Sequence, residues 1–327
     1  PQLEPVGAGP RGFGDGGAGG HKGVLWFRND LRLHDHRALD EAMKKCASIL
    51  AVFCFDPREY NGQWTGPYKC RFAQEAVRAL RKKLRRLNSD LVIRLGKPED
   101  VLPQLCQQAN ATAVFCHSEA ARRDREVEAA VRKRLPERCV LKAYGGAATL
   151  HHLDHGDEAS DKAMAASKSN AGSSSKLSGG RIGAKTGLRG DKCSNFSSFS
   201  KRMREEDVQR PLRTPAKLRP FPQVSGMRRG TVPTLRELGI SKPKQKLNLP
   251  DGRVAKGGEE AALSYLRRHA ATVLPDQLAP WFSLGCLSLR ESYWRVKKAM
   301  HKQAATFYDE LLWRDFYRYS VSLNSSQ

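Results

Sequence analysis

Short apolar runs alternate with longer amphipathic runs between residues 23 and 143. The apolar runs are rich in Val, Ile, Leu and Phe, which is typical of strands buried on both faces of a sheet. They fall at 24–27, 48–55, 90–95, 112–116 and 139–142. Because amphipathic helices fit the intervals between them, the pattern predicts an α/β fold in which helices cover both faces of a parallel sheet.

The clearest amphipathic run extends from 69 to 87. Phe72, Leu80 and Leu84 fall on one stripe at helical spacing, and arginines and lysines fill many of the remaining positions. We therefore expect a helix whose apolar side packs on the sheet and whose outer side is basic.

Two stretches lack the apolar content that a packed core requires. Residues 1–22 are rich in Gly, and residues 154–202 are rich in Ser and Gly with few aromatic side chains. Burial in such segments does not offset the conformational entropy lost on ordering, about 1–2 kcal/mol per residue. We predict that both are disordered, and that the proline-containing stretch 203–250 is an extended connection between domains.

After residue 250 the apolar pattern is helical. It predicts helices over 259–274, 288–300 and 306–323, the last two opened by capping-box sequences at 288–291 and 306–309. This helical part, 251–327, is short for a domain with a core of its own.

Charge and cysteine usage narrow the class of protein. The 327 residues include 57 Lys and Arg against 34 Asp and Glu, a net charge of +23. The electrostatic field of so positive a protein favours a polyanion as binding partner, and nucleic acid is the first candidate. A basic surface that contacts only solvent is the alternative, because such surfaces are common. No apolar run reaches the roughly 20 residues that a membrane-spanning helix needs. The 8 cysteines form no CxxC pair, which favours buried free thiols in a reducing compartment.

Four side chains of different chemistry share one face of the last predicted helix. Glu310, Trp313, Arg314 and Tyr317 stand at i, i+3, i+4 and i+7, so a carboxylate, an indole, a guanidinium and a phenol can meet one ligand. The spacing is equally compatible with an exposed Glu310–Arg314 ion pair worth about 0.3–0.5 kcal/mol, beside a half-buried Trp313. Spacing alone leaves both interpretations open.

Several runs resemble the photolyase/cryptochrome family in their order and separation. The runs 310–318 (ELLWRDFYR) and 280–288 (PWFSLGCLS) resemble its FAD-binding domain, and 24–39 (VLWFRNDLRLHDHRAL) resembles its first strand and the following loop. Shorter runs resemble the DASH cryptochromes in particular, namely 90–99 (DLVIRLGKPE), 211–215 (PLRTP) and 257–262 (GGEEAA).

The resemblance implies a Rossmann-like α/β antenna domain at 23–153 and part of an all-helical FAD-binding domain at 251–327. It implies a blue-light flavoprotein of the deoxyribodipyrimidine photolyase type, in which photoexcited reduced flavin donates an electron to a cyclobutane pyrimidine dimer and receives it back. The DASH branch is associated with dimers in single-stranded DNA, and an unpaired substrate lowers the cost of base flipping. Repair and photoreception are both compatible with this resemblance.

Site residues follow from the same resemblance. Glu310 matches the carboxylate that hydrogen-bonds the base edge of the dimer, and Trp313 matches the aromatic on which the dimer packs. Arg314 matches a cation near substrate and flavin, and Tyr317 lies with them at the DNA. The residues expected to contact FAD are Leu278, Ala279, Phe307 and Arg314.

The first domain offers two further candidates. Glu119 matches the acidic position that contacts a methenyltetrahydrofolate antenna, or is an ordinary charge at a strand end. The loop after the first strand, with Arg28 and Asp30, lies at the carboxyl edge where open α/β sheets bind ligands. Arg28 and Asp30 are equally compatible with a structural role.

Two departures from the family weaken the expectation of full activity. A tyrosine-containing segment is missing, and in the turn 275–279 Pro275 has no N–H, Asp276 would repel a diphosphate and Ala279 has no hydroxyl. The chain also stops at Gln327, before the later flavin-binding helices of the family. We therefore expect an incomplete chain that binds FAD weakly or not at all.

Two other interpretations stay open. In the first, the chain is a non-catalytic α/β module that binds an antenna pterin or nucleic acid. In the second, it is a nonfunctional, aggregating product of partial gene structure. For the leading interpretation we expect a monomer that contacts no membrane and lies inside the cell, in a chloroplast, mitochondrion or nucleus that the sequence does not distinguish.

Overall fold

The computed structural model describes residues 20–63, 65–151, 193, 195–204, 207–243, 247–299 and 303–324. Residues 1–19 and most of 154–202, where we predicted disorder, lie outside these ranges. The prediction was wrong for the end of the second stretch, because residues 196–202 belong to helix α6 (Phe196–Arg204). Phe199 and Met203 anchor this helix in the hydrophobic core.

Five parallel strands form one sheet in the order β3-β2-β1-β4-β5. They are β1 (Lys22–Phe27), β2 (Ser48–Phe55), β3 (Leu91–Leu95), β4 (Ala113–His117) and β5 (Val140–Tyr144). The central strand β1 pairs with β2 through Val24↔Leu50 and with β4 through Val24↔Val114. The predicted α/β fold is confirmed, and the strand order reverses between β1 and β4.

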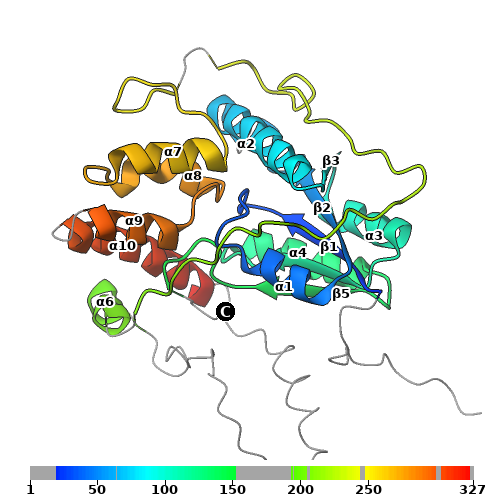
Figure 1. Ribbon diagram of the computed structural model, residues 1–327, viewed down its shortest axis with the longest axis horizontal. Helices are drawn as coiled ribbons and strands as arrows, with labels where there is room; N and C mark the ends of the chain where they lie inside the picture. Colours follow the sequence, from blue (N-terminus) through cyan, green and yellow to red (C-terminus); the bar gives the residue numbers. More distant parts are fainter. Residues whose placement is uncertain are drawn as a thin grey trace, which may run out of the picture.

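Helices cover both faces of the sheet, as Figure 1 shows. Helices α1 (Arg37–Lys45) and α2 (Pro67–Arg86) pack on the face that includes Leu25 and Phe53. Helices α3 (Pro98–Ala109) and α4 (Arg122–Arg134) pack on the opposite face. Each helix therefore buries one stripe against the alternating side chains of the strands.

The helical part shares its core with the α/β part. It comprises α7 (Glu259–His269), the 3₁₀ helix η1 (Pro275–Leu278), α8 (Ala279–Ser283), α9 (Leu289–Ala299) and α10 (Gln303–Asn324). The ring of Trp281 on α8 lies 6.2 Å from that of Phe72 on α2. At Gly258, with φ of 115°, a Cβ would lie 2.6 Å from the Cβ of Ala79. This close approach lets the start of α7 pack directly on α2 (Figure 1).

Helix boundaries show where local patterns mislead. The capping prediction at Ser288 is confirmed, since its Oγ accepts a hydrogen bond from the N–H of Glu291 (3.3 Å) at the start of α9. The helix predicted over 259–274 ends at His269, where the N–H groups of Thr272 and Val273 both bond to the His269 carbonyl. Helix α10 begins at Gln303 rather than at Thr306.

The connection after α6 has no helix or strand over residues 207–243, and in Figure 1 it runs along the α/β part before reaching α7. All eight cysteines are free and buried, as predicted. In the part of the chain that the structure describes, we find no helix with both the length and the apolar character to cross a membrane.

Candidate functional site

The four side chains predicted to share a face do share one side of α10. Trp313 keeps 43% of its surface exposed and Tyr317 keeps 65%, Glu310 is exposed and Arg314 is half-buried. The opposite side of the helix enters the core through Leu311, Leu312 and Tyr319. Helix α10 therefore packs through its apolar side and presents these four groups at its other side.

Trp313 is stacked on an aromatic ring from a distant part of the chain. The Phe196 ring of α6 lies 3.6 Å from it, nearly parallel at 10°, and Tyr317 lies 6.1 Å away on the same helix. Phe196 thus covers one face of the indole. The sequence gives no local signal for this contact, because Phe196 falls in the stretch predicted to be disordered.

Arg314 does not bond Glu310 in the described structure but turns toward α8. Its Nη2 donates to the Phe282 carbonyl (3.2 Å), and its buried Nε has no hydrogen-bond partner among the described residues. Burial and the nearby Arg318 lower the pKa of Arg314. The half-buried Arg314 therefore carries one unused donor, which suits an anionic ligand.

An acidic environment lies beside Glu310. Partial burial and the nearby Asp276 raise the pKa of Glu310. Asp276 is exposed, and its Oδ1 accepts a hydrogen bond from the N–H of Gln277 (2.7 Å). The carboxylate at the turn before α8 therefore adds negative charge near the place where the resemblance puts the FAD phosphates.

The residues predicted to bind FAD differ in accessibility. The side chains of Leu278 and Phe307 are buried in the hydrophobic core, whereas Ala279 is exposed at the start of α8. The fit to FAD is therefore partial. Arg314 provides one suitable donor, while Asp276 opposes a diphosphate.

Glu119, the predicted antenna contact, lies at the carboxyl end of β4 and is buried. Its carboxylate forms an ion pair with Arg318 of α10. The pair joins the α/β part to the helix that holds Trp313, so Glu119 faces the junction between the two parts of the chain.

The predicted loop candidates lie at the point where the strand order reverses. Arg28 donates to the His117 carbonyl (3.2 Å) and pairs with Glu128 and Asp124 of α4. The carboxyl ends of β1 and β4 are therefore tied together by buried charges. This arrangement supports a structural role for Arg28.

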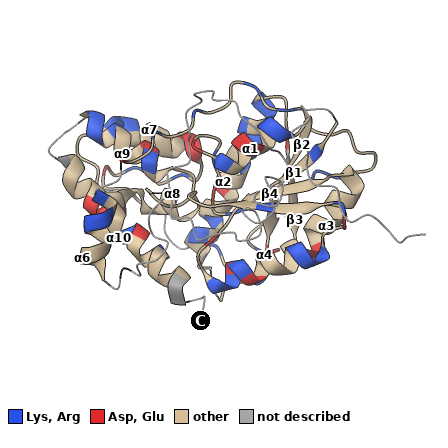
Figure 2. Ribbon diagram, turned by 90° about the horizontal axis from the view of Figure 1, so that it is seen from below, with Lys and Arg blue, Asp and Glu red and all other residues tan. Residues whose placement is uncertain are grey.

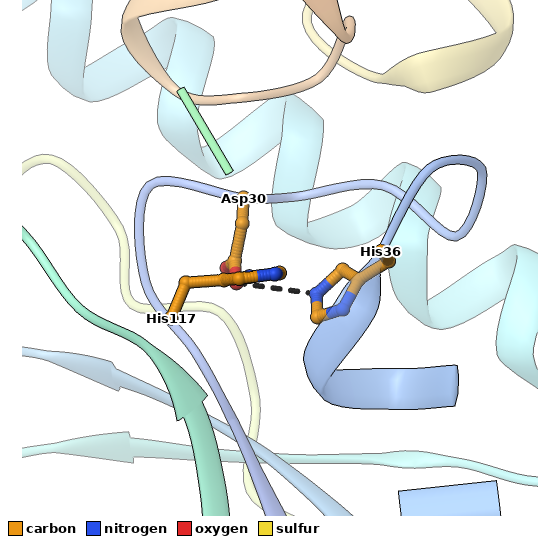
Figure 3. A group of neighbouring side chains, drawn as sticks. All are labelled: Asp30, His36 and His117. Carbon is orange, nitrogen blue, oxygen red and sulfur yellow. Dashed lines mark hydrogen bonds and ion pairs between the residues drawn. The ribbon is translucent and has the colours of Figure 1, made fainter. Parts of the chain in front are cut away.

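Asp30 lies between two histidines, His36 and His117, as Figure 3 shows. Its Oδ2 is 2.6 Å from His117 Nδ1 and 3.1 Å from His36 Nε2, and its Oδ1 accepts the N–H of Arg28 (2.6 Å). All three side chains are buried. Such a group has the composition of a metal site, and its atoms are close enough for one.

The hydrogen bonds of the histidines indicate a different role. The far ring nitrogens accept backbone N–H groups, from Leu39 to His36 Nδ1 (3.0 Å) and from Ala38 to His117 Nε2 (3.4 Å). The His117 ring therefore carries its proton on Nδ1, the nitrogen that faces Asp30. Burial lowers the pKa of His117 to about 4. Although burial opposes ionisation, His36 and His117 keep the pKa of Asp30 well below its usual range. The three residues form an anchored carboxylate that joins β1, α1 and β4.

A second buried network docks the helical part, and sequence reasoning missed it. Arg290 of α9 bonds both oxygens of Asp35, with Nε–Oδ2 of 2.9 Å and Nη2–Oδ1 of 3.0 Å. Ser288 donates to the same carboxylate, and the N–H of Leu212 reaches it at 3.1 Å. One loop carboxylate therefore holds α9 and the connecting segment together.

Comparison with known proteins shows what this chain is similar to. The DNA photolyase family model matches residues 23–167. The chain is 29% identical to the blue-light photoreceptor PHR2 of Arabidopsis thaliana, over 93% of this chain and 70% of that protein. It is 31% identical to the cryptochrome DASH of Gloeobacter violaceus, over 90% of this chain and 58% of that protein.

Solved structures show the same architecture. The cryptochrome of Synechocystis sp. superposes with a TM-score of 0.72 at 26% identity, over 93% of this chain and 62% of that one. The photolyase of Sulfolobus tokodaii, solved with two FAD molecules, shares the fold with a TM-score of 0.67 at 21% identity. The chain therefore spans about three fifths of the structures that it matches. The family model, the named relatives and the shared fold agree that the chain is similar to cryptochromes and photolyases.

Proposed function

We propose that the chain is a cryptochrome DASH-like blue-light flavoprotein that recognises pyrimidine dimers in single-stranded DNA, for light-driven repair, photoreception or both. The observation that carries the proposal is the exposed face of α10, where Trp313, Glu310, Arg314 and Tyr317 stand together beside α8. The similarity to DASH cryptochromes supports it.

Three of these side chains have a distinct physical role in the proposal. The half-exposed indole of Trp313 offers a surface on which the two unstacked bases of a dimer can pack, an interaction worth about 1–3 kcal/mol per base. The exposed carboxylate of Glu310 can accept hydrogen bonds from a base edge. Arg314, held by the Phe282 carbonyl, stabilises negative charge next to both.

FAD is the cofactor in this proposal, and this chain binds it weakly. When bound, the cofactor supplies light absorption and the transferable electron. The unused Nε of Arg314 attracts an anionic part of FAD. In this proposal the exposed Ala279 lies next to the bound FAD, and the buried Leu278 and Phe307 pack η1 and α10 against the core. The carboxylate of Asp276 counteracts this attraction, since a diphosphate is also negative.

The antenna in the proposal is a methenyltetrahydrofolate held near Glu119. The ion pair between Glu119 and Arg318 lies at the junction of the α/β and helical parts, where an antenna could transfer energy to the α10 face. We further propose that the protein is monomeric and intracellular.

A non-catalytic module that binds a pterin or nucleic acid is the second candidate. The observation that favours it is the exposed carboxylate of Asp276, which lies outside the α/β part and whose negative charge opposes a diphosphate. The absorption spectrum of the purified chain distinguishes the candidates. A weak flavin band that grows on addition of FAD supports the first, whereas a folate band without any flavin uptake supports the second.

The α10 face is tested with an oligothymidylate that contains one cyclobutane dimer. We expect Glu310→Ala to slow light-driven dimer splitting more than it weakens DNA binding, and Trp313→Ala to weaken dimer binding by about tenfold, in line with the loss of one stacked base. The matched control is Glu260→Ala, which removes an exposed carboxylate of α7. If both α10 variants lose splitting and binding equally, or behave like the control, the proposed roles are wrong.

A further inference from the structure

An open groove about 640 Å³ in volume lies on the α/β part, between α2 and the connecting segment. Its lining is Arg78, Arg81, Lys82, Arg85, Arg86, Thr231 and Val232. In Figure 1, α2 lies beside α7 over the sheet, whereas α10 lies below α9, and no residue of α10 lines the groove. The groove is therefore separate from the face that carries Trp313.

The amphipathic pattern of α2 explains why the cations converge. The helix buries Val77, Leu80 and Leu84 in the core, which turns Arg78, Lys82 and Arg86 outward at i, i+4 and i+8. Side chains four residues apart stand about 6 Å apart along a helix. This spacing is close to the rise along the helix axis between alternate phosphates of one strand of B-form DNA, about 7 Å.

The second wall of the groove is held in place by the edge of the sheet. The N–H of Ile93 in β3 donates to the Arg229 carbonyl (2.9 Å), and Arg81 Nη1 donates to the Gly230 carbonyl (2.7 Å). Arg94 Nη2 bonds the Arg228 carbonyl (2.7 Å). These bonds fix the backbone of the connecting segment along one side of the groove, so the groove is preformed.

Acidic side chains neutralise only part of the positive charge of this groove. Asp90 bonds Arg81 Nε (2.9 Å) and Arg85 Nε (3.1 Å). Arg78, Lys82 and Arg86 form no ion pair with any residue that the structure describes. An excess of positive charge therefore remains along one side of the groove.

We propose that this groove binds the phosphate backbone of nucleic acid, independently of base identity and damage. A concave surface lined by regularly spaced cations contacts a strand along its length, whereas a flat lipid surface would reach only the rim. Backbone contacts of this kind are sequence-independent and depend on salt through counterion release. The groove would hold a strand whose bases remain free for other contacts.

The matched control lies on the opposite face of the sheet. Arg132 and Lys133 in the last turn of α4 are also exposed and basic, and α4 carries visible positive charge in Figure 2. The variants Arg78→Glu/Lys82→Glu and Arg132→Glu/Lys133→Glu change the net charge of the protein equally. Any difference in nucleic-acid binding between the two double variants is therefore due to the groove and not to the net charge of the protein.

The test measures fluorescence anisotropy of an undamaged oligothymidylate in the dark, over a range of salt concentrations. We expect the groove variant to weaken binding by about tenfold or more at low salt and to reduce the slope of log K against log salt by about 1.4, corresponding to two phosphates on a single strand. The α4 variant is expected to change both quantities much less. Because light, flavin and dimers are absent, the result does not depend on the proposed repair function.

Equal losses in the two double variants would overturn the proposal, since they would show an effect of net charge alone. An unchanged groove variant would overturn it as well. Vesicles containing phosphatidylserine form a further arm of the test. If the groove variant loses vesicle binding but keeps oligonucleotide binding, the partner is a membrane surface and the proposal is wrong.

Discussion

The buried pair of Asp35 and Arg290 provides a sharp test of how the two parts of the chain are joined. Asp35 lies in the loop after β1 and Arg290 in the first turn of α9, and their side chains are 1% and 4% exposed. Two hydrogen bonds of 2.9 and 3.0 Å connect them. Replacement of the guanidinium by Arg290→Met leaves the Asp35 carboxylate buried without the cation that bonds both of its oxygens.

Loss of one partner from a buried ion pair costs about 3–5 kcal/mol. The matched control is on the same helix, where Arg295 pairs with Glu291 (2.5 Å) at the partly exposed surface. Such an exposed i,i+4 pair contributes about 0.3–0.5 kcal/mol. We therefore expect Arg290→Met to lower the free energy of unfolding several times more than Arg295→Met.

Urea unfolding followed by circular dichroism and tryptophan fluorescence measures both variants. The double variant Asp35→Asn/Arg290→Met should recover part of the loss, because it removes the unpaired charge. Although burial opposes ionisation, Arg290 and Arg32 lower the pKa of Asp35, so the stability that the pair contributes is present above about pH 4 and is lost as the pH falls further. Equal destabilisation by Arg290→Met and Arg295→Met would refute the docking role of the pair.

Two further predictions concern the same junction. Burial raises the pKa of Asp315 to about 7, so the folded state retains a proton that the unfolded chain loses above about pH 4. The free energy of unfolding of the native protein, relative to that of Asp315→Asn, should then fall by about 1.4 kcal/mol per pH unit as the pH rises from about 4 to about 7. If urea unfolding shows a difference that does not change with pH, this prediction is wrong. At Gly285, with φ of 61°, a Cβ would lie 1.9 Å from the Asn29 carbonyl oxygen, whereas at Gly239, with φ of 69°, it would meet no atom within 4 Å. Gly285→Ala should cost more than about 4 kcal/mol and Gly239→Ala only about 1–2 kcal/mol, and similar thermal midpoints for the two variants would disprove the close contact.

Local patterns were sufficient for the elements of the α/β part. The apolar run 48–55 coincides with β2 (Ser48–Phe55), and the amphipathic run 69–87 overlaps α2 (Pro67–Arg86). These predictions succeed because a strand buried on both faces is apolar along its length and a covering helix is apolar along one stripe. In each case the pattern lies within a single strand or helix, so it can be recognised from the local sequence.

The capping sequences illustrate the limit of local information. Ser288 caps α9 as predicted, but the similar sequence at 306–309 lies inside α10. There Asp309 pairs with Arg204 of α6, which the local sequence does not reveal. A side chain that satisfies a cap can equally bond another element, and only the packing decides between the two.

The succession of apolar and amphipathic runs was sufficient to predict the parallel α/β fold. Helical periodicity within one segment was sufficient for the basic outer side of α2 and for the shared face of Glu310, Trp313, Arg314 and Tyr317. The environment of that face depends on the tertiary structure. It stacked Phe196 on Trp313 and paired Glu119 with Arg318, 199 residues further along the chain. It also gathered Asp30, His36 and His117 where the strand order reverses. Contacts of this kind join segments that are distant in sequence, and their geometry is set by how the elements pack around a common core.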